Sequence, residues 1–217
     1  MNAEDLRETL ATCLSSMRVI PEIVAGTLSK EDLKQAVLNH YGETRSFIDV
    51  QLPARMYICP HDAMSAKRYF HYLYEEEQGF FGKEPNHALL FLPVCEDLGL
   101  TAHECEAYYA KYAQYYFHLF QKGPSLENLV EQLATSYAWE SVTPFFGQNA
   151  LAAFRDTYQF SERAMQYFER HFAVDDDHSK AAEAVLLEYC TTSALCEIAL
   201  KAIRDTLGSD LYLVKRL

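Results

Sequence analysis

The sequence predicts an all-α fold, a bundle of about eight helices that forms a single domain over residues 1–217. Prolines and glycines, which interrupt helices, number seven and eight, and most fall between stretches with a helical spacing of apolar residues. No segment with the alternating pattern of a strand is longer than the closing LYLVKRL. With 49% hydrophobic and 23% charged residues, the composition is that of one globular domain.

Start and stop signals divide the chain into the expected helices. Ser29 and Asp32 form a variant of the capping box, and Thr101 and Glu104 form a complete one. Glycines and prolines separate most of the other helical stretches. The expected helices cover residues 4–17, a stretch that begins after Ser29, and residues 61–78, 85–98, 102–120, 125–140, 146–158, 161–174 and 176–207.

Charge and composition exclude several classes of function. The formal net charge of −12 argues against a nucleic-acid partner, because binding phosphates requires clustered Lys and Arg. No stretch approaches the roughly 18 apolar residues of a membrane span, and the start MNAEDLRETL is unlike a signal peptide. The six cysteines show no CxxC pairing. We expect a cytoplasmic protein with reduced thiols, no membrane partner and a small-molecule substrate; a homodimer is compatible with the sequence.

The most informative segment is HFAVDDDH. His171, Asp175 and His178 are spaced i, i+4 and i+7, so they project from one face of a helix that is apolar before and after them. Burying two imidazoles and a carboxylate is costly unless each is paired or binds a metal. Asp176 and Asp177 fall off this face and are expected in solvent. A polar helix end in a loop, or core histidines satisfied by hydrogen bonds, would also explain the pattern.

Three further candidates lie on other expected helices. Glu76 stands in a run of three glutamates, and helical phase does not separate it from Glu77. His87 follows just inside the next helix, and Glu140 lies beside the single tryptophan, Trp139. Judged singly, each has an ordinary explanation as a solvated or capping residue. Together, carboxylates and imidazoles from separate helices that face one bundle interior are typical of a nonheme di-iron site.

The order of these segments, YEEEQG, PNHALLF, SYAWES and HFAVDDDH, resembles the heme-oxygenase-like di-metal oxidases and oxygenases of the TenA/PqqC/CADD-like superfamily. The family pattern is a Glu at an acidic helix end, a Gly turn, Asn-His, a single Glu and a His-x3-Asp-x2-His helix. The resemblance covers about residues 15–200. It implies a heme-oxygenase-like helical bundle in which two iron ions are bound by Glu76, His87, Glu140, His171, Asp175 and His178.

The resemblance also implies an oxidoreductase that depends on dioxygen and acts in biosynthesis. Members of the family cleave C–C bonds, desaturate, N-oxygenate or form nitriles, with amino acids or fatty acids as substrates, and an amino acid is expected here. The metals supply the redox chemistry, and the protein fixes their geometry in a dry cavity. Candidate pocket residues, for whose aromatic members core packing is the simpler explanation, are Tyr69, Tyr72, Tyr116, Trp139, Phe145, Arg55 and Arg68.

The chain departs from the family pattern in two respects. A few more residues separate Glu76 from His87, which keeps Glu77 as an alternative ligand. Some relatives consume one of their own tyrosines to make para-aminobenzoate, but Ile20 and Trp139 stand where tyrosines would be, so that chemistry is not expected. Two alternatives remain: a metal-free TenA/PqqC-like enzyme, which in the TenA case normally uses a cysteine nucleophile near the middle of the chain, and a non-catalytic helical interaction protein.

Overall fold

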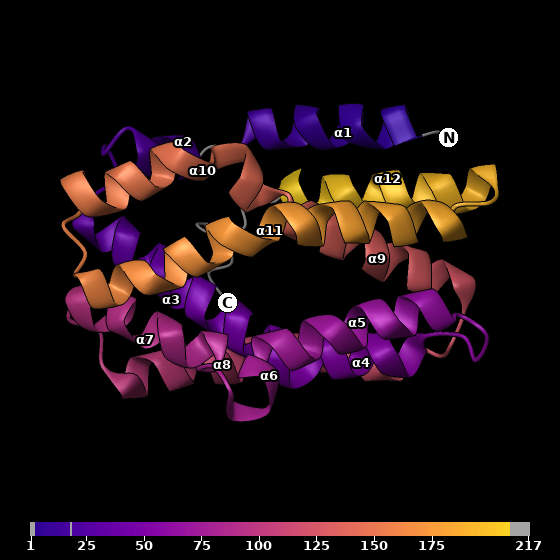
Figure 1. Ribbon diagram of the computed structural model, residues 1–217, viewed down its shortest axis with the longest axis horizontal. Coiled ribbons are helices and arrows are strands. Elements are labelled where there is room, and N and C mark those ends of the chain that lie inside the picture. Colours follow the sequence, from indigo (N-terminus) through magenta and orange to yellow (C-terminus); the bar gives the residue numbers. More distant parts are fainter. Residues whose placement is uncertain (1–2, 18, 209–217) are drawn as a thin grey trace.

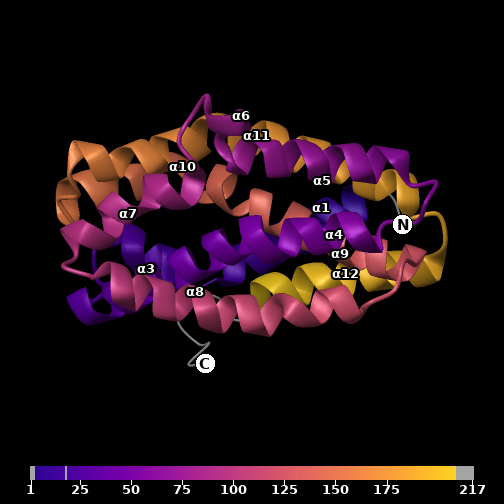
Figure 2. The ribbon, with the colours of Figure 1, turned by 90° about the horizontal axis from the view of Figure 1, so that it is seen from below.

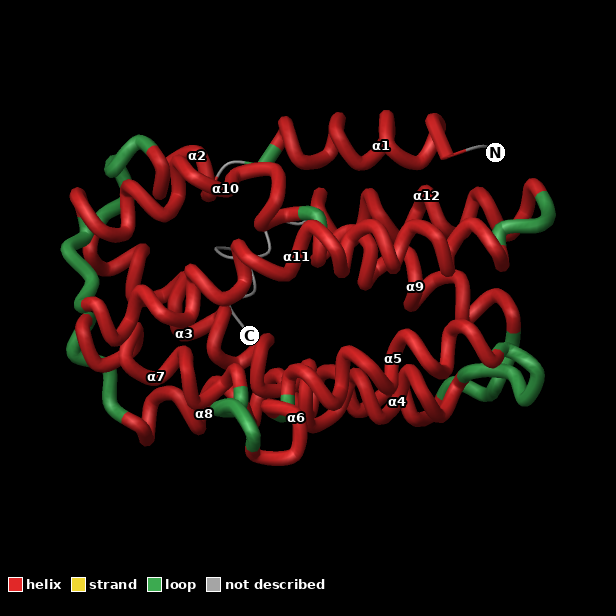
Figure 3. Tube along the Cα trace, viewed as in Figure 1, coloured by secondary structure: helices red, strands yellow, loops and turns green. Residues whose placement is uncertain are grey.

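The computed structural model describes residues 3–17 and 19–208, and the described residues contain helices and no strand (Figure 1, Figure 3). The all-α prediction is confirmed, and the count roughly matches the expected eight because the additional helices are short. The α-helices are α1 (Ala3–Ser16), α2 (Val19–Val24), α3 (Lys30–Ser46), α4 (Leu52–Ile58), α5 (Met64–Glu77), α6 (Gly79–Gly82), α7 (His87–Asp97), α8 (Ala102–Tyr116), α9 (Leu126–Glu140), α10 (Val142–Ala152), α11 (Glu162–Tyr189) and α12 (Ser193–Gly208). Two π-helical segments, η1 (Phe47–Gln51) and η3 (Ala153–Thr157), and a 3₁₀ segment, η2 (Phe117–Gln121), adjoin them.

The long helix α11 connects the two apolar clusters that make up the core. Its first half supplies Ala164 and Met165 to a cluster with α3 and α7, and its second half supplies Ala182 and Leu186 to a cluster with α1, α5, α9 and α12. α5, α7, α9 and α10 all contact α11, and Figure 2 shows α7 and α5 following one another along it. Between its two apolar ends α11 carries buried polar residues, so the candidate site lies where the two clusters meet.

The caps predicted from sequence are present. Ser29 accepts a hydrogen bond from the backbone N–H of Asp32 and begins α3. At α8 the Thr101 hydroxyl accepts from the backbone N–H of Glu104, whose carboxylate accepts in return from the backbone N–H of Thr101. These contacts satisfy N–H groups that the first turn of a helix leaves without partners.

The expected break near residues 174–176 is wrong, because α11 is continuous from Glu162 to Tyr189. Asp175 is buried, whereas Asp176 lies on the surface and pairs with Lys180 one turn on at 2.5 Å, so the acidic run does not end the helix. The expected single helix over residues 176–207 is interrupted instead before Ser193, where the Thr192 hydroxyl accepts from the backbone N–H of Leu195 at the start of α12. No glycine or proline marks that break in the sequence.

Several short elements were not predicted. α4 begins directly after η1 and has Pro53 in its first turn. The strand-like LYLVKRL lies outside the described residues. None of the described helices combines the length and the apolar character needed to cross a bilayer. The six cysteines form no disulfide, as expected.

Candidate metal centre

Two groups of metal-binding side chains lie at the junction of the core clusters. In each group, one ligand atom from every residue lies within 4.8 Å of the others. The first group combines α5, α7 and α11, and the second combines α9 with α11. The groups are Glu77, His87 and His171, and Glu140, Asp175 and His178. Five of the six side chains predicted as ligands are therefore in these groups, together with Glu77, the alternative to Glu76.

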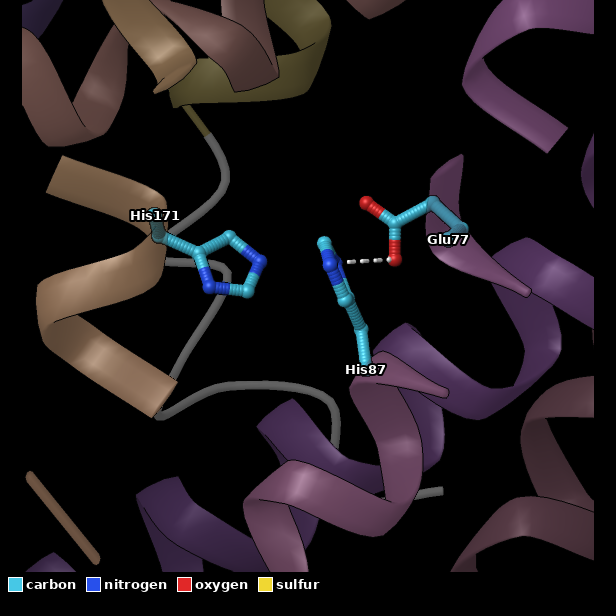
Figure 4. A group of neighbouring side chains, drawn as sticks. All are labelled: Glu77, His87 and His171. Carbon is cyan, nitrogen blue, oxygen red and sulfur yellow. Dashed lines mark ion pairs between the residues drawn. The ribbon is translucent and has the colours of Figure 1, made fainter. Parts of the chain in front are cut away.

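Figure 4 shows the first group, with His87 between Glu77 and His171. Oε2 of Glu77 lies 2.9 Å from Nδ1 of His87, and the rings of His87 and His171 are 4.8 Å apart. Burial opposes the charge of Glu77, but the charge of His87 and its hydrogen bond to the carboxylate outweigh burial and lower the pKa of Glu77. Burial likewise opposes the charge of His87, and Glu77 outweighs it and raises the pKa of His87. Without a metal these two residues are an ion pair.

The ring of His171 is held in an orientation that leaves one nitrogen available to a metal ion. Its Nδ1 lies 2.8 Å from the backbone carbonyl of Tyr167, one turn earlier in α11, and a carbonyl can only accept, so Nδ1 carries the hydrogen. The other nitrogen, Nε2, then has the lone pair that a metal requires. Burial lowers the pKa of His171 to about 4, so the ring is neutral near pH 7.

The second group is centred on His178. Its Nδ1 lies 3.4 Å from Oε2 of Glu140 and 3.9 Å from Oδ1 of Asp175. Burial, followed by the charge of Glu140, raises the pKa of Asp175 to about 8. Burial opposes protonation of His178, but its contacts with Glu140 and Glu76 outweigh burial and raise the pKa of His178 to about 11. Without a metal, a proton on His178 partly balances the carboxylates.

Glu76 lies at the opposite side of the same imidazole. Its Oε2 is 2.5 Å from Nε2 of His178, and its Oε1 is 3.6 Å from the guanidinium of Arg170. Only 2% of Glu76 is exposed. Arg170 also pairs with Glu84 at 2.5 Å, which ties the segment before α7 to α11. Arg170 was not predicted from the sequence, where its one signal is its position next to His171.

These residues fit a pair of divalent cations. In the first group, Oε2 of Glu77 and Nδ1 of His87 are buried without a hydrogen bond of good geometry. Such atoms are costly in a protein interior unless an ion or proton compensates them. Carboxylates and imidazoles on facing helices are the donors used by di-iron and di-manganese proteins.

The seven residues predicted to line a substrate pocket do not come together in one place. Tyr72, Phe145 and Arg68 are exposed, although the ring of Tyr72 is 6.1 Å from that of His178. Tyr69 is buried near Glu140, whose charge adds to burial in raising its pKa.

A cavity of about 600 Å³ with many polar lining residues lies apart from the two metal groups. Its wall includes Arg55, Tyr116 and Trp139. The Arg55 guanidinium donates there to Gln51, Gln132 and Ser136.

Known proteins resemble this chain both in sequence and in structure. The sequence matches the model of a family described as iron-containing redox enzymes over residues 33–209. No curated protein matches it significantly. Among solved structures, a TenA homologue from Pseudomonas syringae pv. tomato is similar, with a TM-score of 0.72, 16% identity, and coverage of 98% of this chain and 93% of that one. This likeness shows the fold alone and confirms the heme-oxygenase-like, TenA/PqqC-type architecture. Since the family match spans most of the chain, this protein belongs to the family of iron-containing redox enzymes.

Proposed function

We propose that this protein is a nonheme di-iron enzyme that uses dioxygen to oxidise or oxygenate a small molecule. The observation that carries the proposal is the pair of largely buried groups connected by α11, in which only His171 and Glu140 are half-buried. His171 and Asp175 are four residues apart, a rise of about 6 Å along a helix. The two groups therefore lie next to each other along α11.

In this proposal Glu77, His87 and His171 bind one ion, and Glu140, Asp175 and His178 bind the other. Glu77 thus takes the position for which the sequence favoured Glu76.

Glu76 contacts the nitrogen of His178 that faces away from Glu140, so it is placed to hold the orientation of the imidazole. Glu76, Glu77, Glu140 and Asp175 together carry four negative charges, which balance two divalent ions when the histidines are neutral.

The iron ions would supply the binding and activation of dioxygen, and the side chains would supply the geometry. The bond from Nδ1 of His171 to the Tyr167 carbonyl keeps Nε2 available, and the rings of Tyr167 and His87 pack against this imidazole. We further propose an amino acid as the substrate, with C–C cleavage, desaturation, N-oxygenation or nitrile formation as the classes of reaction that the resemblance to heme-oxygenase-like oxidases implies.

Anaerobic titration with Fe(II) tests the metal centre. We expect two ions per chain, and uptake of dioxygen when an amino acid that is a substrate is added. His171→Ala should reduce the iron content to about one per chain. His103→Ala, which removes an exposed histidine of α8, is the matched control and should leave two. One stable zinc per chain without dioxygen uptake would contradict the proposal. A wild-type protein that binds no stoichiometric metal would contradict it as well and would favour a metal-free enzyme.

A further inference from the structure

A cavity of about 140 Å³ lies beside the first metal group, between α2, α3, α7, α10 and α11. His171 forms part of its wall, and so does Thr143, whose side chain interacts with the Asp175 carboxylate. The cavity therefore adjoins one ligand of the first group directly and reaches the second group through Thr143. We call it the apolar chamber.

The described side chains that line the apolar chamber carry no formal charge. No Lys, Arg, Asp or Glu is among them, and most are aliphatic or aromatic, including Ile20, Ile23, Val37 and Phe91. The same wall includes Phe154 of η3 and Phe172 of α11.

The polar side chains of the wall are His40, Thr143, Tyr167 and His171. Two of these side chains form a hydrogen bond with each other, since Nε2 of His40 lies 2.7 Å from the hydroxyl of Tyr167. Burial lowers the pKa of His40 to about 3, so this imidazole is neutral near pH 7. The chamber therefore offers no counter-charge to an ionic ligand.

Two physical arguments define what the chamber accepts. An ionised carboxylate or ammonium would lose its hydration there without a partner, which is strongly unfavourable, whereas a hydrocarbon gains about 25 cal/mol for each Å² removed from water. The volume is close to that of an engineered apolar cavity of about 150 Å³ that binds benzene. A group of about six carbon atoms would fill it.

We propose that the apolar chamber binds an uncharged hydrocarbon group of about six carbons, the part of the substrate that carries the C–H bond to be oxidised. Charged groups of the substrate then remain outside the chamber. The assignment of the reacting part rests on the proposed function, but hydrocarbon binding follows from the chamber alone. The side chain of an amino acid and the chain of a short carboxylic acid share this chemistry.

Toluene tests the chamber in the full-length protein, both metal-free and loaded with Fe(II). We expect saturable binding by calorimetry in both forms, and binding of benzylammonium and benzoate at least tenfold weaker than that of toluene. In the loaded protein, competition by phenylalanine or leucine would identify an amino-acid side chain, and competition by hexanoate a short acid. Either result supports the proposal.

Ala150→Leu places extra carbons in the chamber from α10 and should weaken toluene binding at least tenfold. Ala36→Leu does the same from α3, so a folding failure of one variant leaves the other informative. Ala202→Leu is the matched control, because Ala202 is a similarly buried alanine that lines the polar cavity near Arg55. Melting temperatures verify that each variant is folded.

The proposal is overturned if toluene does not bind the folded wild-type protein, if benzoate binds as well, or if both chamber variants bind toluene normally. Failure of the metal centre is a separate result. In that case the iron content is below two per chain, but toluene still binds the metal-free protein.

Discussion

Oε2 of Glu76 lies 2.5 Å from Nε2 of His178, while Nδ1 of the same ring faces Glu140 and Asp175. The next residue, Glu77, contacts His87 in the other group. Two consecutive carboxylates of α5 thus serve two different histidines. Under the proposed function the two carboxylates have different roles, and comparing their variants separates a metal ligand from a residue that positions one.

Glu77→Gln should reduce the iron content from two ions per chain to about one, since it removes the only carboxylate of the first group. Glu76→Gln should retain two ions and weaken the second about tenfold, a typical effect of losing a residue that orients a ligand. Anaerobic Fe(II) titration measures both. If Glu76→Gln loses an ion and Glu77→Gln keeps two, Glu76 is the ligand and our assignment is reversed.

Asp175→Ala should leave one iron bound normally and the other weakly, with loss of turnover, because it removes a buried carboxylate of the second group. Asp177→Ala is the control, since that side chain is 89% exposed and its nearest cation, Lys180, is 4.0 Å away. It should change neither iron content nor rate. Circular dichroism checks the fold, and equal iron content in the two variants would refute the site.

The stability of the metal-free protein should fall as the pH drops below about 6.5, partly because of His40. The pKa of His40 is about 3 in the folded state and near 6.5 in the unfolded chain. Below pH 6.5 the unfolded chain therefore binds a proton that the folded protein does not, so the contribution of neutral His40 to the free energy of unfolding is complete above pH 6.5 and is lost toward pH 3. Between pH 7.5 and pH 5 the protein should lose about 1–2 kcal/mol of unfolding free energy through His40.

His40→Gln should reduce that loss, because an amide takes up no proton. His103→Gln, at an exposed position, should not reduce it. Urea unfolding at the two pH values measures the difference, and an unchanged loss in His40→Gln would show that His40 does not contribute.

Thr101→Ala should destabilise the protein by about 1 kcal/mol, because it removes the hydroxyl that caps α8. Thr12→Ala is the comparison, since that hydroxyl donates to the Glu8 carbonyl within α1 and caps no terminus. We expect a change within about 0.5 kcal/mol there. Urea unfolding curves measure both. Equal effects would mean that the cap contributes nothing beyond an ordinary surface threonine.

Local patterns in the sequence were enough to predict the all-α class, the caps at Ser29 and Thr101, and the common face of His171, Asp175 and His178. These features depend on contacts within about four residues, so local spacing encodes them. The resemblance of the motifs indicated the family.

Other features depend on which elements pack against each helix, and these could not be predicted from local patterns. Glu76 and Glu77 both have apolar neighbours on α5, and only the positions of α7 and α11 bring Glu77 to His87 and Glu76 to His178. The acidic run after Val174 predicted a helix end. In the structure α11 continues through it, because Asp175 faces the core whereas Asp176 faces the solvent. The apolar chamber is formed by helices that are far apart in the chain, and local sequence patterns do not predict which of their faces pack together.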